Sequence, residues 1–286
     1  MADILQVEQL SKEYREFTLR DVNFRLPEGS VMGLIGENGA GKTTVIELIL
    51  NLISRKSGKV TVFGLDNQNH EREIKEQLGV VMAEGGFYEA LSPRDMAKVL
   101  RRVYHTWDDS VFHDFLDRFQ LPAQKAVKEL SRGMRMKLSI AAAMSHHPRL
   151  LILDEATSGL DPVVRDEILD IFREFIQDEK NSILISSHIT SDLEKIADYI
   201  TFIHQGSVLL SEPKDDLIYR YGILKCGTEQ FGRVEKEDYI TYRKNEYGYE
   251  MLVENKEECR RKYHDYVVDA ADLEDIMLFY VKGEKA

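Results

Sequence analysis

The segment of this sequence with the plainest chemistry is glycine-rich and ends in a lysine and a threonine. Gly36-Glu-Asn-Gly-Ala-Gly-Lys-Thr43 matches the phosphate-binding pattern G-x-x-x-x-G-K-[ST]. Glycines let a backbone curl its N–H groups around phosphates, and the N-terminus of a following helix adds positive potential. We expect Lys42 to reach the β- and γ-phosphates of ATP and Thr43 to coordinate Mg²⁺. A chance glycine turn is disfavoured because an apolar strand precedes the segment and helical spacing follows it.

Two adjacent carboxylates form a second candidate for chemistry. Leu150-Leu-Ile-Leu153 is an apolar, strand-sized run, and Asp154 and Glu155 follow it directly. Asp154 is suited to hold Mg²⁺, directly or through water. Glu155 would then orient or deprotonate the attacking water. A strand that ends in Asp-Glu is common by itself, and it becomes informative here because it follows a phosphate-binding loop in the same chain.

Three further segments have a recognisable order around that run. Leu130-Ser-Arg-Gly-Met134 lies before it, Ser158-Gly-Leu-Asp161 lies after it, and His188 follows the next apolar segment. Over about residues 1–215 this order resembles the nucleotide-binding domain of ABC ATPases.

The resemblance implies a role for each matched position. In that family a Leu-Ser-Gly-Gly-Gln signature binds the γ-phosphate held by the opposite subunit, so Ser131 and the Gly133 backbone would do so here. His188 would contact the γ-phosphate and the attacking water, although a lone histidine is more often structural. Tyr14 would stack on adenine, with Phe17 as a competitor for that role. The implied nucleotide contacts are Tyr14, Gly36, Glu37, Asn38, Gly39, Ala40, Gly41, Lys42, Thr43, Thr44, Ser131, Gly133 and Asp161, and the implied catalytic residues are Lys42, Glu155 and His188.

The sequence departs from the family pattern in two places. Arg132 and Met134 replace the first glycine and the glutamine of the signature, while the serine and glycine that contact phosphate are kept. After the apolar run Leu78–Met82 the family has a glutamine, and Ala83 stands there instead, with Glu84 beside it as a possible substitute. We expect activity to survive the first change. The second removes the side chain that makes the usual contact with Mg²⁺ and water in the family.

The elements that must position these residues can also be read from the pattern. Residues 4–35 read as strands, and strand-like and helical segments alternate from Lys42 to about 215. This predicts an α/β fold of the P-loop NTPase (RecA-like) type, with a largely parallel sheet and an antiparallel β subdomain. Residues from about 88 to 147 read as an inserted helical subdomain, with Pro93 and Pro122 near helix starts. The pattern over residues 221–286 predicts a small C-terminal α+β appendage.

Composition limits the classes of protein that this chain can be. It has 286 residues, a formal net charge of −12, and 50 acidic against 38 basic side chains, which argues against a protein that coats DNA or RNA. Its two cysteines, Cys226 and Cys259, are more readily explained as free thiols than as a disulfide. No apolar run approaches the roughly 20 residues needed to cross a bilayer, so any membrane role would come through a partner.

Together these features predict an ATPase subunit that pairs with a second such subunit around two MgATP. By resemblance, the pair would drive an integral-membrane permease, with export as the expected direction, from the cytoplasmic face of the membrane. Whether the pair is a homodimer or includes a paralogue stays open. A soluble ABC ATPase acting in cofactor assembly or translation is an alternative. A second alternative is a regulatory subunit that binds ATP but barely hydrolyses it. Ala83 suggests this alternative, because it stands where the family has a glutamine.

Overall fold

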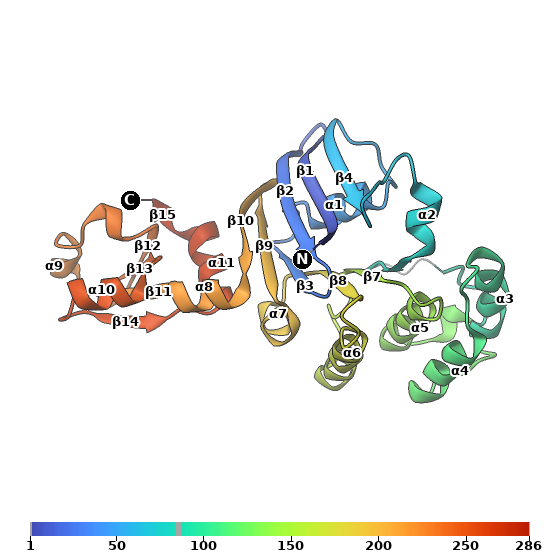
Figure 1. Ribbon diagram of the computed structural model, residues 1–286. Helices are drawn as coiled ribbons and strands as arrows, with labels where there is room; N and C mark the ends of the chain where they lie inside the picture. Colours follow the sequence, from blue (N-terminus) through green and yellow to red (C-terminus); the bar gives the residue numbers. More distant parts are fainter. Residues whose placement is uncertain (1, 84–86, 286) are drawn as a thin grey trace. The chain divides into compact units, whose positions relative to one another are not determined.

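The protein is described by a computed structural model that covers residues 2–83 and 87–285. By its internal contacts the chain divides into two compact units, Met1–Ser211 and Glu212–Ala286. The limits predicted from the sequence, 1–215 and 221–286, end the first unit four residues later and begin the second nine residues later. Each unit has an architecture of its own, and each is described by itself below (Figure 1).

A six-stranded sheet with the order β10-β9-β3-β8-β7-β6 forms the centre of the first unit. The pairs β3–β8, β3–β9, β7–β8 and β6–β7 are parallel. Its inner strands are almost entirely buried, as expected for a parallel sheet covered on both faces. The strands are β3 (Val31–Ile35), β6 (Leu78–Val81), β7 (Leu150–Asp154), β8 (Ser182–Ser187), β9 (Tyr199–His204) and β10 (Ser207–Pro213).

One face of this sheet is covered by α1 (Lys42–Ile49) and by a second, antiparallel sheet of order β2-β1-β4-β5. Its strands are β1 (Asp3–Glu13), β2 (Thr18–Pro27), β4 (Ser57–Val62) and β5 (Leu65–Asp66). Strand β2 alternates buried and exposed side chains, the pattern of a sheet with one solvated face. The antiparallel β subdomain expected from the sequence is therefore present, and Figure 1 shows it stacked over α1.

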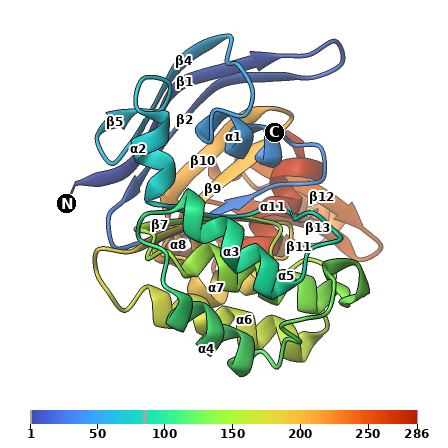
Figure 2. The same ribbon diagram turned by 90° about the vertical axis from the view of Figure 1, so that its right-hand side faces the viewer.

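Helices α5 (Arg132–Met144), α6 (Pro162–Phe175) and α7 (Thr190–Ile196) lie on the opposite face (Figure 1). Helices α3 (Pro93–Val103) and α4 (Asp109–Arg118) and the short η1 (Val127–Glu129) complete the helical segment with α5, and Figure 2 shows α3 and α4 beside it. Ser92, Asp108 and Ser131 cap α3, α4 and α5. Pro93 opens α3 as predicted, but the prediction for Pro122 was wrong because Pro122 lies in the loop after α4.

Between β5 and β6 lies the short helix α2 (Glu71–Glu76), which was not predicted from the sequence. Its sequence has a single buried apolar residue, Ile74, so it carries almost no helical periodicity. The apolar runs Leu78–Met82 and Leu150–Leu153 form β6 and β7, and the helical subdomain expected at about 88–147 is present as α3, α4, η1 and α5.

The second unit is built on a five-stranded sheet of order β14-β11-β13-β12-β15. Its elements are α8 (Lys214–Arg220), β11 (Gly222–Cys226), α9 (Thr228–Phe231), η2 (Lys236–Asp238), β12 (Thr241–Asn245), β13 (Gly248–Val253), α10 (Lys256–Lys262), β14 (Val267–Ala270), α11 (Leu273–Lys282) and β15 (Glu284–Lys285). The unit has a hydrophobic cluster of its own, in which Leu224 and Met251 are fully buried. Cys226 and Cys259 are free and buried, which confirms the prediction of two thiols.

Candidate functional site

The glycine-rich loop joins β3 to α1 and has the backbone that its glycines allow. Gly39 and Gly41 have φ values of +84° and +113°, a region that side chains with a Cβ rarely adopt. A Cβ on Gly41 would lie 2.9 Å from the Phe17 ring, and one on Gly36 would lie 2.3 Å from the Ile203 carbonyl oxygen. At Gly36 the loop thus lies against β9, and at Gly41 against Phe17 just before β2, so a larger residue at either of these two positions would force a shift.

Lys42 begins α1 and is held within the loop. Its side chain is only 6% exposed, and its Nζ donates to the carbonyl oxygens of Gly36 at 2.7 Å and Glu37 at 3.3 Å. The same ammonium lies 3.3 Å from Glu155 Oε1, an ion pair that spans more than a hundred residues of sequence. The structure therefore brings together the lysine and the glutamate that the sequence nominated separately.

Thr43 joins the loop to the end of β7. Its hydroxyl donates to Asp154 Oδ2 at 2.9 Å, and the Ser186 hydroxyl donates to Asp154 Oδ1 at 2.6 Å. Asp154 is 2% exposed, so these two hydroxyls hold a buried carboxylate in one orientation. A hydroxyl next to a carboxylate is the set of hard oxygen ligands that suits Mg²⁺. Within the described part of the chain no group of three or more His, Cys, Asp or Glu residues could hold a metal, so an ion here would also need phosphate or water oxygens.

Glu155 also contacts His188, the residue that follows β8. Glu155 Oε2 lies 2.6 Å from His188 Nδ1, and the Glu155 backbone N–H donates to the Ser186 carbonyl at 3.2 Å. Glu155 has a φ of +51°, an uncommon conformation for a residue with a Cβ and one often found at functional sites. The glutamate therefore sits between a cation, Lys42, and an imidazole, an arrangement that can orient a proton acceptor.

The signature segment lies at the N-terminus of α5, and its polar groups serve as caps. The Ser131 hydroxyl accepts from the Met134 N–H at 3.2 Å. Asp161 accepts from the N–H groups of Val163 and Val164 at the start of α6. Ser131 and Arg132 are exposed, which leaves that helix end accessible.

Two aromatic residues, Tyr14 and Phe17, are the candidates for stacking on adenine. Tyr14 is 46% exposed and its ring centre lies 6.5 Å from that of Phe17. Phe17 approaches Gly41, so of the two candidates for stacking it is the one that contacts the loop. Of the remaining predicted contacts, Asn38, Ala40 and Thr44 lie in the loop or the first turn of α1 with the rest of the motif.

Sequence reasoning missed Ser186, which bonds both Asp154 and the Glu155 backbone. It lies in a buried apolar strand, and only the pairing of β7 with β8, Asp154 opposite Ser186, reveals its place. Ala83 is exposed just after β6. Glu84, named as its possible substitute, and the following Gly85-Gly86 lie outside the described residues.

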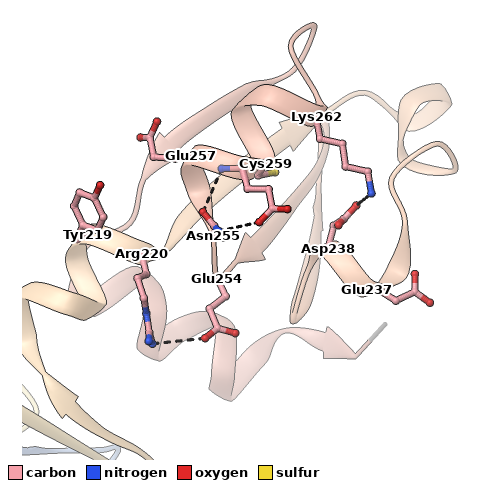
Figure 3. Close-up of a pocket in the computed structure, with 10 residues that line it drawn as sticks. Tyr219, Arg220, Glu237, Asp238, Glu254, Asn255, Glu257, Cys259 and Lys262 are labelled. Atoms are coloured by element: carbon pink, nitrogen blue, oxygen red, sulfur yellow. Dashed lines mark hydrogen bonds and ion pairs between the residues drawn. The ribbon is translucent and has the colours of Figure 1, made fainter.

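The second unit contains a pocket of about 530 Å³, shown in Figure 3. Two cationic side chains take part in ion pairs there, Lys262 with Asp238 at 2.7 Å and Arg220 with Glu254 at 3.6 Å. None of the residues predicted to bind nucleotide lines it. Its lining is Tyr219, Arg220, Glu237, Asp238, Glu254, Asn255, Glu257, Glu258, Cys259 and Lys262.

Comparison with known proteins also supports the family resemblance that the motifs indicated. The sequence profile of the family described as "ABC transporter" matches residues 19–158. The bacitracin transport ATP-binding protein BcrA of Bacillus licheniformis is 33% identical over 220 residues, which cover 76% of this chain and 72% of that protein. The lantibiotic transport ATP-binding protein SrtF of Streptococcus pyogenes is 35% identical over 215 residues, covering 74% of this chain and 92% of the other.

Solved structures show the same fold. One described as an ATP binding subunit of an ABC transporter has a TM-score of 0.68 at 27% identity, covering 80% of this chain and 93% of that one. A second, a dimeric ATP-binding cassette bound to ADP and Pi, has a TM-score of 0.66 at 18% identity and covers 73% of this chain and 98% of that one. The α/β fold of the P-loop type expected from the motifs is confirmed.

Proposed function

Since the chain belongs to the ABC transporter family, as its ATP-binding and ATP-hydrolysing subunit, we propose that it works in a pair that binds two MgATP and drives a membrane permease. Asp154 and Thr43 would hold Mg²⁺, Lys42 would bind the β- and γ-phosphates, and Glu155 would orient the attacking water. His188 would contact the γ-phosphate and the attacking water. The ion would neutralise charge on the phosphates as the bond to the γ-phosphate breaks.

The observation that carries the proposal is the hydrogen bond of 2.9 Å from Thr43 to Asp154. It joins the phosphate loop to the strand end that also bears Glu155. Lys42 and His188 contact opposite oxygens of that glutamate. A purely structural glycine turn would not require a buried lysine, a buried aspartate and a strained glutamate at one strand edge.

Pairing is supported by the location of the signature. Ser131 and Gly133 begin α5, and a helix N-terminus favours an anion. In the family this segment completes the site of the opposite subunit, so the phosphate that Ser131 and Gly133 bind would come from a second chain. Asp161 and the loop before it would lie at the same contact.

The permease is proposed from the relatives, whose names describe transport of bacitracin and of lantibiotics. Export is the proposed direction, since expelling such compounds protects a cell. None of the helices among the described residues is long and apolar enough to cross a membrane. The permease would dock on the helical segment at 88–147 and on the stretch from Ala83 to Leu91, part of which lies outside the described residues. This would place the chain at the inner face of the cell membrane.

Replacing Lys42 with alanine tests the phosphate site. The change removes the charge that would stabilise the transferred phosphoryl group, so turnover of MgATP by the purified protein should fall by about 100-fold or more. Lys59→Ala, which removes an exposed lysine of β4, is the matched control and should keep normal turnover. Near-normal hydrolysis by Lys42→Ala would reject the role given to that residue.

Replacing Glu155 with glutamine tests pairing. The variant keeps the shape of the side chain but cannot accept a proton, so MgATP should stay bound and hold two chains together. Size-exclusion chromatography with MgATP should show a dimer, and the same run without nucleotide should show a monomer. A chain that stays monomeric with saturating MgATP would count against the pair.

A search for a neighbouring gene that encodes a membrane protein, followed by co-expression of that protein with this chain, separates the proposal from a soluble role in cofactor assembly. A stable complex in detergent, with ATPase activity that changes on binding, is the expected result. Wild-type turnover near the background of Lys42→Ala would instead favour the regulatory subunit that Ala83 suggested.

A further inference from the structure

Arg132 stands where the family signature has a glycine, and its side chain makes a specific contact. It is the first residue of α5, and its Nη2 donates to the Ser158 carbonyl oxygen at 2.8 Å. Ser158 belongs to the loop between β7 and α6. The guanidinium therefore ties the start of α5 to a loop 26 residues away in sequence.

Gly159, the next residue of that loop, shows how close the contact is. Its φ is +67°, and a Cβ at this position would lie 2.4 Å from Arg132 Nη1 and 2.7 Å from Arg132 Cζ. The guanidinium thus occupies the space that a side chain at 159 would need. The backbone conformation favours glycine at 159, and a side chain there would also displace the guanidinium of Arg132.

Two further observations place α5 beside α6. A Cβ on Gly133 would meet Val164 Cγ1 at 3.7 Å, an ordinary packing distance. One turn farther along, Lys137 Nζ lies 2.6 Å from Glu167 Oε2. Arg132 extends this seam beyond the helices to the loop that precedes α6.

The charge of Arg132 has a cost that this contact offsets. The first turn of α5 has no acidic residue and contains Arg132 and Arg135, although the N-terminus of a helix already carries partial positive charge. Arg135 directs one of its nitrogens to the Leu130 carbonyl at 3.2 Å, within its own segment. Arg132 alone of the pair reaches the neighbouring loop, and a planar guanidinium suits that role better than an ammonium.

We propose that Arg132 is a positioning residue that clamps the Ser158–Gly159 backbone to the first turn of α5. The clamp makes the signature and the loop that ends at Asp161 one fixed surface for the second ATPase subunit. The structural half of the inference is the clamp itself, and it depends on this chain alone. The functional half is the surface for the second subunit, and it rests on the proposed pairing. The two halves are tested separately.

A double-mutant cycle on thermal unfolding tests the clamp itself. Gly159→Ala should lower the unfolding temperature through backbone strain and through the clash with the guanidinium. In an Arg132→Ala background there is no guanidinium to displace. Gly159→Ala should therefore lower the unfolding temperature by about 2–6 °C less there than it does in the wild type. Equal effects of Gly159→Ala in both backgrounds would overturn the contact.

The functional half is tested in the Glu155→Gln background by titrating protein at saturating MgATP. Arg132→Ala should raise the protein concentration for half-maximal dimer by about tenfold, as expected when a charged hydrogen bond is lost. Binding of a fluorescent ATP analogue to the monomer should be unchanged, since Arg132 lies outside the chain's own phosphate loop. A merely structural role would not separate these two readouts.

Two variants separate the clamp from simple charge. Arg132→Lys keeps the cation but lacks the planar fork, and it should behave like Arg132→Ala. Arg135→Ala removes the same charge from the same turn and should shift dimer formation by less than about threefold. Full rescue by lysine, or an equal loss in Arg135→Ala, would reject positioning in favour of charge. If Glu155→Gln itself fails to dimerise, the proposed pairing falls and takes the functional half with it, while the thermal cycle still decides the clamp.

Discussion

At the scale of single residues, the site is held together by short polar contacts between segments far apart in sequence. Thr43 reaches Asp154, and Lys42 reaches Glu155. Because the carboxyl ends of parallel strands meet at one edge of a sheet, β3 and β7 deliver these residues to the same place. The types of residue could be predicted from the motifs. The place of Ser186 in the site could not be predicted, because nothing in the sequence distinguishes one serine in an apolar strand from any other serine.

A second feature at the scale of single residues is the buried histidine His146, which lies just after α5. It is 1% exposed, stacks on Tyr104 at 3.9 Å between ring centres, and its Nε2 lies 2.9 Å from the Leu78 carbonyl oxygen. Burial lowers the pKa of His146 below its usual 6.5, since the surroundings disfavour the charged ring. The neutral ring is therefore the form that the fold accepts.

We predict a loss of stability in acid from this residue. The folded pKa is below the unfolded one, so the stability that the neutral ring contributes is present above pH 6.5 and is lost as the pH falls toward the folded pKa. The unfolding temperature of the wild type should drop between pH 7 and pH 5 by more than that of His146→Gln. His105→Gln, at an exposed position, is the control and should follow the wild type. Parallel curves for wild type and His146→Gln would contradict the prediction.

At the scale of elements, α6 and α7 are joined by two ion pairs of different burial. Asp192 is 1% exposed and its Oδ2 lies 3.9 Å from Arg165 Nε. Asp166 and Lys195 form a second pair between the same helices at 3.2 Å, with both side chains exposed. The two pairs offer a matched comparison of buried and exposed charge. Because α7 follows His188 directly, its packing against α6 also fixes the backbone next to the site.

We predict that Asp192→Asn costs about 2 kcal/mol of folding stability, which is below the cost for a fully buried pair because Arg165 keeps some exposure to water. For a unit of this size that corresponds to about 4–8 °C in unfolding temperature. Asp166→Asn should cost less than about 0.5 kcal/mol, since exposed pairs contribute little. Equal shifts for the two variants in a thermal melt would show that burial does not govern this contact.

How far the sequence predicts the elements depends on what each one buries. Strands such as β7 and β8, buried on both faces, were predicted closely because a short continuous apolar run is typical of a strand inside a parallel sheet. Helix α2 was missed because its fold depends on contacts at Ile74 rather than on an apolar stripe. In the second unit β12 begins only at Thr241, and a short 3₁₀ turn precedes it. Half-buried strands with many tyrosines give an alternation too weak to fix their ends.

At the scale of the whole molecule, the chemistry and the second unit belong to different parts of the chain. Every residue proposed to bind ATP or Mg²⁺ lies in Met1–Ser211. The hydrophobic cluster around β1, α1 and the central sheet is formed by residues of that unit, and the second unit has its own cluster. We infer that the first unit can fold without the second.

We predict that a chain ending at Pro213, the last residue of β10, keeps MgATP affinity within about threefold of the full chain. Its phosphate loop, Asp154 and Glu155 have all their described partners within the part that remains. Binding of a fluorescent ATP analogue and circular dichroism of the shortened chain would measure this. A loss of folded signal would show that the second unit supports the first.

The burial of both cysteines has a practical consequence for spectroscopy. Burial raises the pKa of the Cys259 thiol to about 11, and desolvation also raises that of Cys226. At pH 7–8 neither thiol is accessible as a thiolate, so maleimide dyes should leave the native surface unlabelled. A single cysteine introduced at an exposed position, such as Tyr247, would then carry the only fluorophore. In a pair of chains, energy transfer between the two labelled positions would follow the catalytic cycle, and neither native cysteine would have to be removed first.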